Sequence, residues 1–275
     1  KDKNIKIRCW DKKYIKAVED FFKVLIPKLL PYLETNGGKI IAMQVENEYG
    51  SFGRDKKYLY WLRDLMRELG VDVQLFTSDG EDRYFFSGGG IPEDWMVANF
   101  GGYHEHRFDD LKMLQPDKPL MCGEHWCGWF DQWGAKHHTD DAEESLGKSL
   151  DGFFNEDANF NLYMFHGGTN FGFSSGANYY DCYCPTTTSY DYGAPLSECG
   201  GYTDKYFVLR ERMQKQLGKE LPELPADTNA SASPFFTRFI ATTMEESFFL
   251  RIATTGGSAI SITSLAGTTV NRSFG

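Results

Sequence analysis

Apolar positions along the chain follow two alternating patterns. Stretches with apolar residues at helical spacing predict helices, and the short apolar runs between them predict fully buried strands. The expected helices cover residues 11–34, 56–69, 106–114, 140–154 and 204–217. The expected strands are the run between Gly37-Gly38 and Gly50-Ser51 and the runs 71–77, 95–100, 120–123 and 160–166. Helices that alternate with buried strands indicate an α/β fold with a parallel sheet.

Two local features refine this pattern. Pro27 should kink or split the first helix, because proline lacks an amide hydrogen and its ring clashes with the preceding turn. Residues 87–90 read Ser-Gly-Gly-Gly and lack the lysine and Ser/Thr of a phosphate-binding loop, so we expect a flexible loop there.

Two of the predicted strands end in acidic residues. The first runs into Glu46-Asn47-Glu48, and the fourth ends at Glu124, which three tryptophans follow within nine positions. A carboxylate beside an apolar core loses hydration, and in β/α barrels this edge of the sheet carries the catalytic side chains. Tryptophan is flat and amphipathic, which suits the apolar face of a sugar ring. Two acids on different strand ends are the groups that glycoside hydrolysis uses.

Four segments carry a resemblance to a known family. GGKIIAMQVENEYGSFG, KPLMCGEHWCGWFDQWG, NLYMFHGGTNFGFSSGANY and TSYDYGAPLSECGGYTDKY resemble, in order and spacing, the family 35 glycoside hydrolases, the β-galactosidases of that name. The resemblance extends to about Leu217 and implies a (β/α)8 TIM barrel of the glycosidase type. It implies that Glu48 is the general acid/base and Glu124 the nucleophile. It also implies that the sugar is bound by Asn47, Tyr163, Tyr190 and Tyr192.

The number of strands departs from the family pattern. A complete barrel has eight strands in roughly 250 residues, whereas five are predicted here, and the family places the Glu48 segment at the end of the fourth strand. The first three β/α units, with their Gly-Pro-Tyr-Ile-Cys-Ala-Glu motif, are therefore expected to be absent: either the sequence is a fragment or something else closes the barrel. We expect a partial barrel over 1–220, a proline-containing linker over 221–230, and a β-rich or irregular tail over 231–275 with alternation at 248–253 and 259–263.

Composition excludes some partners and leaves others open. A net charge of −10 argues against nucleic acid, and no apolar run is long enough to span a membrane. The aromatic share of 16% fits a carbohydrate groove but would also fit an ordinary core. Six scattered cysteines favour a reducing, cytoplasmic location, although pairing among Cys182, Cys184 and Cys199 stays open. A secreted or surface location also stays open because the N-terminal units are missing, and oligomeric state is not indicated.

Several side chains have competing interpretations. Glu46 is the main rival of Glu48, and we expect it to be a helix-facing or supporting acid. Asn47 could be a turn residue and Tyr163 could belong to the core, whereas an exposed Tyr190 or Tyr192 in a loop would be harder to explain structurally. Of the three tryptophans, Trp126 is our candidate for the sugar platform.

Histidines could suggest a metal at three places, but the spacing fixes no third ligand. These places are His104-Glu105-His106, His125 and His137-His138. We therefore predict no metal and no organic cofactor. The predicted function is a retaining exo-β-galactosidase that removes terminal β-galactose by double displacement. The alternatives are an inactive galactoside-binding remnant and a metal-dependent hydrolase.

Overall fold

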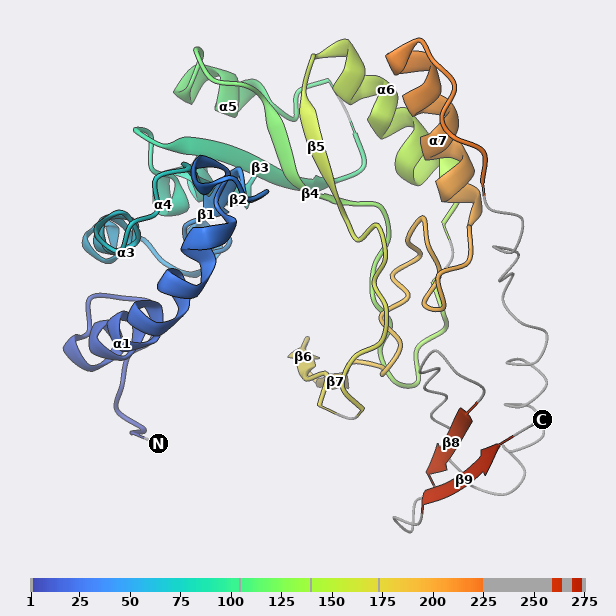
Figure 1. Ribbon diagram of the computed structural model, residues 1–275, viewed down its shortest axis with the longest axis horizontal. Coiled ribbons are helices and arrows are strands. Elements are labelled where there is room, and N and C mark those ends of the chain that lie inside the picture. The colour runs from blue at the N-terminus through green and yellow to red at the C-terminus, as the bar shows by residue number, and fades with distance from the viewer. Residues whose placement is uncertain are drawn as a thin grey trace. The chain divides into compact units, whose positions relative to one another are not determined.

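The computed structural model describes residues 2–103, 105–138, 140–172, 174–224, 259–263 and 269–273 (Figure 1). The chain divides into two compact units. Unit 1 consists of Lys1–Gly128 and Asp141–Met164, and unit 2 of Trp129–Asp140 and Phe165–Gly275. Each unit has its own arrangement of helices and strands.

A five-stranded parallel sheet forms the centre of unit 1. Its strands follow one another in chain order, so every neighbour in the sheet is also the next strand in sequence. This order confirms the predicted parallel β/α arrangement and the predicted five strands, and it is consistent with part of a TIM-type barrel. The strands are β1 (Ala42–Gln44), β2 (Gln74–Gly80), β3 (Trp95–Gly101), β4 (Met121–Trp126) and β5 (Asn159–Tyr163).

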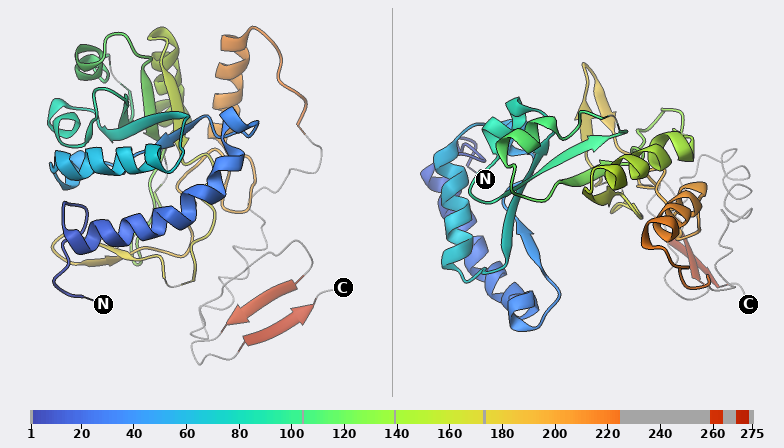
Figure 2. Two further views of the ribbon diagram at one scale, coloured as in Figure 1. Left: turned by 60° about the vertical axis from the view of Figure 1, so that its left-hand side comes forward. Right: turned by 90° about the horizontal axis from the view of Figure 1, so that it is seen from above.

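Helices connect these strands and cover the outside of the sheet (Figure 2). α3 shows why: its buried side chains recur at helical spacing, and Asp55 caps its first turn by accepting from the Tyr58 amide. The helices of unit 1 are α1 (Lys12–Leu29), η1 (Leu30–Tyr32), η2 (Glu34–Asn36), α2 (Tyr49–Phe52), α3 (Lys56–Glu68), α4 (Arg83–Gly89), α5 (Asp109–Leu114), the π-helix η3 (Glu143–Gly147) and α6 (Lys148–Asn155).

Two buried clusters form the core of unit 1. The first joins α1 and α3 to the first two strands, with Leu59, Leu62 and Leu75 near its centre. In the second, Met96, Ala98 and Phe100 of strand β3 pack against Leu111 of α5 and Phe153 of α6. Alternate residues of β3 thus face the helices, which leaves Val97 and Asn99 on the opposite side of the sheet.

Several predicted boundaries were wrong. Pro27 lies in the last turn of α1 and does not split it, but the helix ends at Leu29, five residues before the predicted end. Strand β2 begins three residues later than expected, β4 continues through Trp126, and β5 ends at Tyr163. The predicted Ser87–Gly90 loop is instead the end of helix α4 and is largely buried.

The glycines of α4 are there because the helix packs closely on its neighbours. A Cβ on Gly88 would lie 2.8 Å from the carbonyl oxygen of Gly53, and one on Gly89 would lie 2.0 Å from a carboxylate oxygen of Asp79. Only glycine fits at these two positions, so the run serves packing and not flexibility.

In its described residues, unit 2 contains loops, two small hairpins and one long helix. β6 (Ala177–Tyr179) and β7 (Tyr183–Pro185) pair antiparallel, and α7 (Asp204–Leu217) confirms the predicted closing helix. In the tail, β8 (Ala259–Thr263) covers one of the two expected alternating runs and pairs antiparallel with β9 (Thr269–Ser273). The other run, 248–253, lies outside the described residues.

Two further expectations concern cysteines and membranes. All six cysteines lie in the described residues and all are free thiols, although the sulfur atoms of Cys182 and Cys184 are 3.4 Å apart. Cys122 is buried as expected, and burial raises its pKa to about 12. Among the helices that the structure describes, none has both the length and the apolar character of a membrane span.

Candidate active site

The acidic turn after strand β1 is held by the end of strand β2. Glu48 has a left-handed backbone, with φ 46°, a conformation uncommon for residues other than glycine. Its amide donates to the Ser78 carbonyl oxygen at 2.9 Å, and the Gly50 amide donates to the Asp79 carboxylate at 2.7 Å. Burial raises the pKa of Asp79 to about 7 although that amide opposes the shift. These bonds fix the direction in which Glu48 leaves the strand.

Glu46 belongs to the helix-facing side of this turn. Its carboxylate pairs with Arg8 at 2.8 Å and accepts the Tyr58 hydroxyl hydrogen at 2.7 Å. The expectation of a supporting, helix-facing acid is confirmed. The two-residue alternation of a strand placed Glu46 on the same side as Glu48, but β1 has already ended at Gln44, and the left-handed backbone of both glutamates replaces that alternation.

A β-bulge at Gly123 sets the side of the sheet that Glu124 faces. Ala98 of β3 pairs with Cys122, but the next residue, Asn99, pairs with Glu124, so Gly123 is an extra residue in β4. Cys122 faces the helix-side core. Without the bulge, simple alternation would turn Glu124 toward that core as well; with it, Glu124 faces the same side of the sheet as Asn99.

Asn99 links the two acids. Its side-chain nitrogen donates to Oε1 of Glu48 at 3.1 Å, and its backbone is the direct sheet neighbour of Glu124. Neighbouring strands lie about 4.8 Å apart. The two residues predicted to be catalytic are therefore brought to one edge of the sheet, with Glu48 bonded to the Asn99 amide and Glu124 on the adjacent strand.

The surroundings of Glu124 oppose its charge. Burial raises its pKa above the ordinary value, the nearby Glu48 charge acts in the same direction, and a hydrogen bond from the Trp126 indole nitrogen, 3.2 Å from Oε2, partly counteracts both.

Three of the predicted binding residues lie in unit 1 with these acids. Trp126 is half-buried, bonded to Glu124, and the direct sheet neighbour of Tyr163 on β5. Asn47 is exposed beside Glu48, and its side-chain oxygen accepts from Gln44 at 2.8 Å. Trp126 and Tyr163 therefore extend the edge of the sheet that carries Glu124.

Comparisons with known proteins identify the family of the chain. The family model described as glycosyl hydrolases family 35 matches residues 1–216. The chain belongs to this family. Beta-galactosidase-1-like protein 3 of Homo sapiens is 42% identical over 82% of the chain and 34% of its own length. Beta-galactosidase of Xanthomonas manihotis is 40% identical over 84% of the chain and 39% of its own length, and that of Homo sapiens is 42% identical over 81% and 33%.

This family 35 chain spans between 33% and 39% of the length of those three relatives. Among solved structures, the Ignisphaera aggregans GH53 catalytic domain is similar with a TM-score of 0.45 and 10% identity over 73% of this chain and 67% of that one. That similarity is too weak to support a conclusion about fold or function.

The remaining two predicted binding residues lie in unit 2. Tyr190 is partly buried, and its ring centroid lies 5.9 Å from that of Phe130 and 5.4 Å from that of Tyr192. Tyr192 is only 1% exposed and packs against Trp129. The interpretation of Tyr192 as an exposed loop aromatic was wrong, because neighbouring rings cover it.

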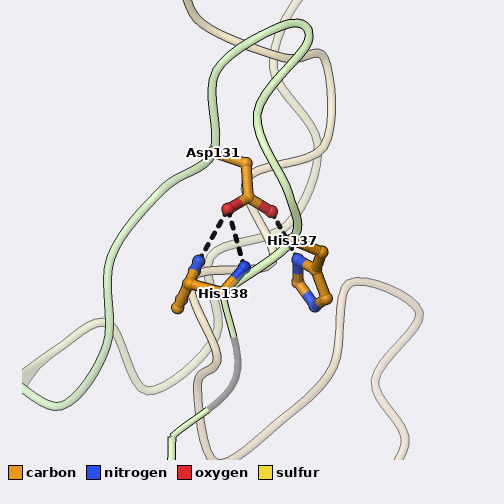
Figure 3. Close-up of side chains that lie close together, drawn as sticks. All are labelled: Asp131, His137 and His138. Atoms are coloured by element: carbon orange, nitrogen blue, oxygen red, sulfur yellow. Dashed lines mark hydrogen bonds and ion pairs between the residues drawn. The ribbon is translucent and has the colours of Figure 1, made fainter.

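Asp131 and two histidines form the cluster in unit 2 that most resembles a metal site (Figure 3). Both histidines direct Nδ1 at the Asp131 carboxylate, and His138 does so at 2.7 Å. The Trp129 amide, however, donates to Nε2 of His138 at 3.1 Å. A neutral imidazole that accepts at Nε2 carries its hydrogen on Nδ1, where a metal would have to bind. The cluster therefore fits a set of hydrogen bonds that holds this loop together better than it fits a metal site.

Each of the other described histidines has its own hydrogen-bond partner. His125 is buried and its Nδ1 lies 3.2 Å from the Phe100 carbonyl oxygen, His106 pairs with Asp109, and His104 lies outside the described residues. The sequence interpretation missed Asn99, Ser78 and the bulge at Gly123. The signal for Asn99 was a single amide inside an otherwise apolar strand, Trp95–Gly101.

Proposed function

We propose that this chain carries the catalytic pair of a retaining exo-β-galactosidase, with Glu48 as general acid/base and Glu124 as nucleophile. The observation that best supports the proposal is the position of both carboxylates beside Asn99 at the carboxyl ends of a parallel sheet. The choice of galactose follows the names of the family 35 relatives, which are beta-galactosidases. Because the chain spans only part of their length, the activity is proposed for the protein that contains these residues.

The proposed reaction has two displacement steps. In the first, the ionised Glu124 forms a bond to the anomeric carbon while the bond to the leaving oxygen breaks and Glu48 gives that oxygen its proton. In the second, Glu48 takes a proton from water, the water oxygen bonds to the anomeric carbon, and Glu124 is released as a carboxylate. We expect the two carboxyl groups to be about 5–5.5 Å apart, the separation of retaining enzymes.

The binding residues have proposed roles in these steps. The Asn47 amide would donate to the sugar 2-hydroxyl, a contact that strengthens as positive charge develops at the anomeric carbon. Trp126 would lie under the apolar face of the sugar, next to the acid that it bonds. Tyr163, Tyr190 and Tyr192 remain proposed sugar-binding residues, with Tyr192 acting through the rings that it supports.

Azide rescue with an aryl β-galactoside tests the two roles separately. Glu124→Ala should lose at least about 10³-fold in turnover, and azide should restore reaction by giving α-galactosyl azide. Glu48→Ala should give β-galactosyl azide, because the covalent intermediate still forms when the leaving group is good. Glu68→Ala, which removes an exposed glutamate at the end of α3, is the matched control and should keep full activity.

Other outcomes would favour the alternatives. Galactose binding without turnover in the unmodified chain would indicate a binding remnant, and activity that a chelator removes but Glu124→Ala spares would indicate a metal-dependent hydrolase. The same azide anomer from both variants would overturn the assignment of the two roles.

A further inference from the structure

A buried polar pair lies behind Glu48 and has no role in the proposed chemistry so far. Ser78 on β2 and Asn99 on β3 are each only 2% exposed. The Ser78 hydroxyl lies 2.6 Å from the side-chain oxygen of Asn99, and the Asn99 nitrogen lies 3.1 Å from Oε1 of Glu48. Buried polar groups need hydrogen-bond partners. Here Ser78 bonds Asn99, and Asn99 in turn bonds the proposed acid/base.

The orientation of the Asn99 amide follows from both of its neighbours. The Glu48 carboxylate can only accept while it is ionised, so the amide must present its NH2 group to it. The Ser78 hydroxyl can then donate to the amide oxygen on the other side. Turning the amide over would place its oxygen against the carboxylate oxygen, so the contact with Glu48 would be lost even though the Ser78 hydroxyl could still accept from the NH2 group.

The backbone of strand β4 packs closely against this pair. A Cβ on Gly123 would lie 2.7 Å from the Ser78 hydroxyl oxygen and 3.0 Å from the Asn99 side-chain oxygen. The bulged glycine that aims Glu124 therefore also closes the space beside the amide. One arrangement of strands thus sets the direction of both acids.

We infer that Asn99 is a positioning residue for the acid/base: locked by Ser78, it holds Oε1 of Glu48, so that Oε2 carries the proton exchanged with the substrate. The inference rests on the proposed function of Glu48. In a protonated carboxyl group the oxygen that accepts an N–H bond is the carbonyl oxygen, and the hydroxyl is the other one. The same oxygen then gives the proton in the first step and takes it back in the second.

Leaving-group dependence separates this role from a merely structural one. Asn99→Ala should lower kcat/KM by about 10- to 100-fold for methyl β-galactoside, which needs acid assistance to leave. For 2,4-dinitrophenyl β-galactoside the loss in kcat/KM should stay within about 3-fold, because this leaving group departs without needing a proton from Glu48. Asn159→Ala is the matched control, since this exposed asparagine donates only to the Leu120 carbonyl oxygen.

A milder variant guards against misfolding. Ser78→Ala leaves Asn99 in place and should show the same difference between the two substrates, reduced to about 3- to 10-fold for the methyl glycoside. Equal losses on both substrates in Ser78→Ala and Asn99→Ala, or no loss in either, would overturn the inference.

An NMR measurement distinguishes failure of this inference from failure of the proposed function, because it needs no turnover. The side-chain amide protons of Asn99 should exchange slowly with water, and they should shift and exchange faster in Glu48→Ala and in Ser78→Ala. If the unmodified chain is inactive but these changes appear, the function fails while the contact stands. If the signals are the same in all three proteins, Asn99 does not position Glu48.

Discussion

Glu124 in unit 1 and Asp131 in unit 2 are both partly buried carboxylates, but their surroundings shift the pKa in opposite directions. Burial and the Glu48 charge raise the pKa of Glu124. For Asp131 burial acts in the same direction, but hydrogen bonds from His137 and His138 together outweigh it and lower the pKa. One environment opposes the charge and the other stabilises it, which is the difference expected between a reacting group and a structural one.

The two units also hold their side chains by different means. In unit 1 the acids are directed by backbone register, a bulge and buried hydrogen bonds between adjacent strands. In unit 2, Tyr190 and Tyr192 pack against aromatic rings. The loop that contains Asp131 is held by hydrogen bonds between Asp131 and its two histidines. Unit 1 should therefore lose function when register changes, and unit 2 should lose stability when a side-chain contact is removed.

Outside the two proposed catalytic acids, Gly123→Ala is expected to have the largest effect. The added Cβ would lie 2.7 Å from both Ser78 Oγ and Val97 Cγ2, so β4 must shift and Glu124 must move with it. A displacement of about 1 Å in a catalytic group can reduce turnover about 100-fold. We expect at least that loss in kcat for an aryl β-galactoside, with the far-ultraviolet circular dichroism spectrum unchanged.

Gly176→Ala is the matched control for that substitution. Gly176 has φ 80° but nothing within 4 Å of the Cβ position, so alanine should reduce stability by about 1 kcal/mol and leave turnover intact. If Gly123→Ala kept full activity, the bulge would not control the position of Glu124.

The sequence was sufficient to predict the five parallel strands and the closing helix α7, because buried apolar runs and helical spacing are strong local signals. It could not show that Gly123 is an extra residue, because a bulge is a relation between two strands. The buried glycine-rich end of α4 was mistaken for a loop for the same reason: what excludes a side chain at Gly89 is Asp79, ten positions away.

The candidate site, like the fold, could be predicted only in part from the sequence. Glu48 and Glu124 could be identified from motifs and strand ends, and the structure brings them to one edge of the sheet. Asn99 was missed because its importance depends on contacts with Ser78 on strand β2 and with Glu48 in the turn after β1. Tyr192 was misjudged because loop composition does not reveal which rings cover it.

Asp131→Asn should have a smaller effect than Gly123→Ala, and the effect should be on the free energy of unfolding. Asparagine keeps the shape but loses the charge that accepts from both histidines, and we expect unfolding to become easier by about 1–2 kcal/mol at pH 7. A carboxylate with a lowered folded pKa stabilises the protein above its unfolded pKa, about 3.9, and that contribution is lost as the pH falls through the folded value. Urea unfolding at pH 7 and near pH 3 should show the difference shrinking in acid.

The exposed turn residue Asp181 provides the control for that measurement. Its φ is 63°, which asparagine adopts readily, so Asp181→Asn should leave stability within about 0.5 kcal/mol at both pH values. A deficit in Asp131→Asn that persists unchanged in acid would contradict the role given to its charge.

Glu124→Gln is expected to have the smallest effect on folding, and in the opposite direction. An acid with a raised folded pKa destabilises the protein when it is ionised in both states, so the variant should be more stable above the raised pKa. Because Glu124 is only half-buried, solvent screening limits the gain to less than about 1 kcal/mol. The gain should disappear as the pH falls below about 4.3, where the carboxyl is protonated in the folded and the unfolded chain. Thermal unfolding of both proteins across this range measures the gain, and a Glu124→Gln variant less stable than the parent at pH 7 would show that this site does not oppose its own charge.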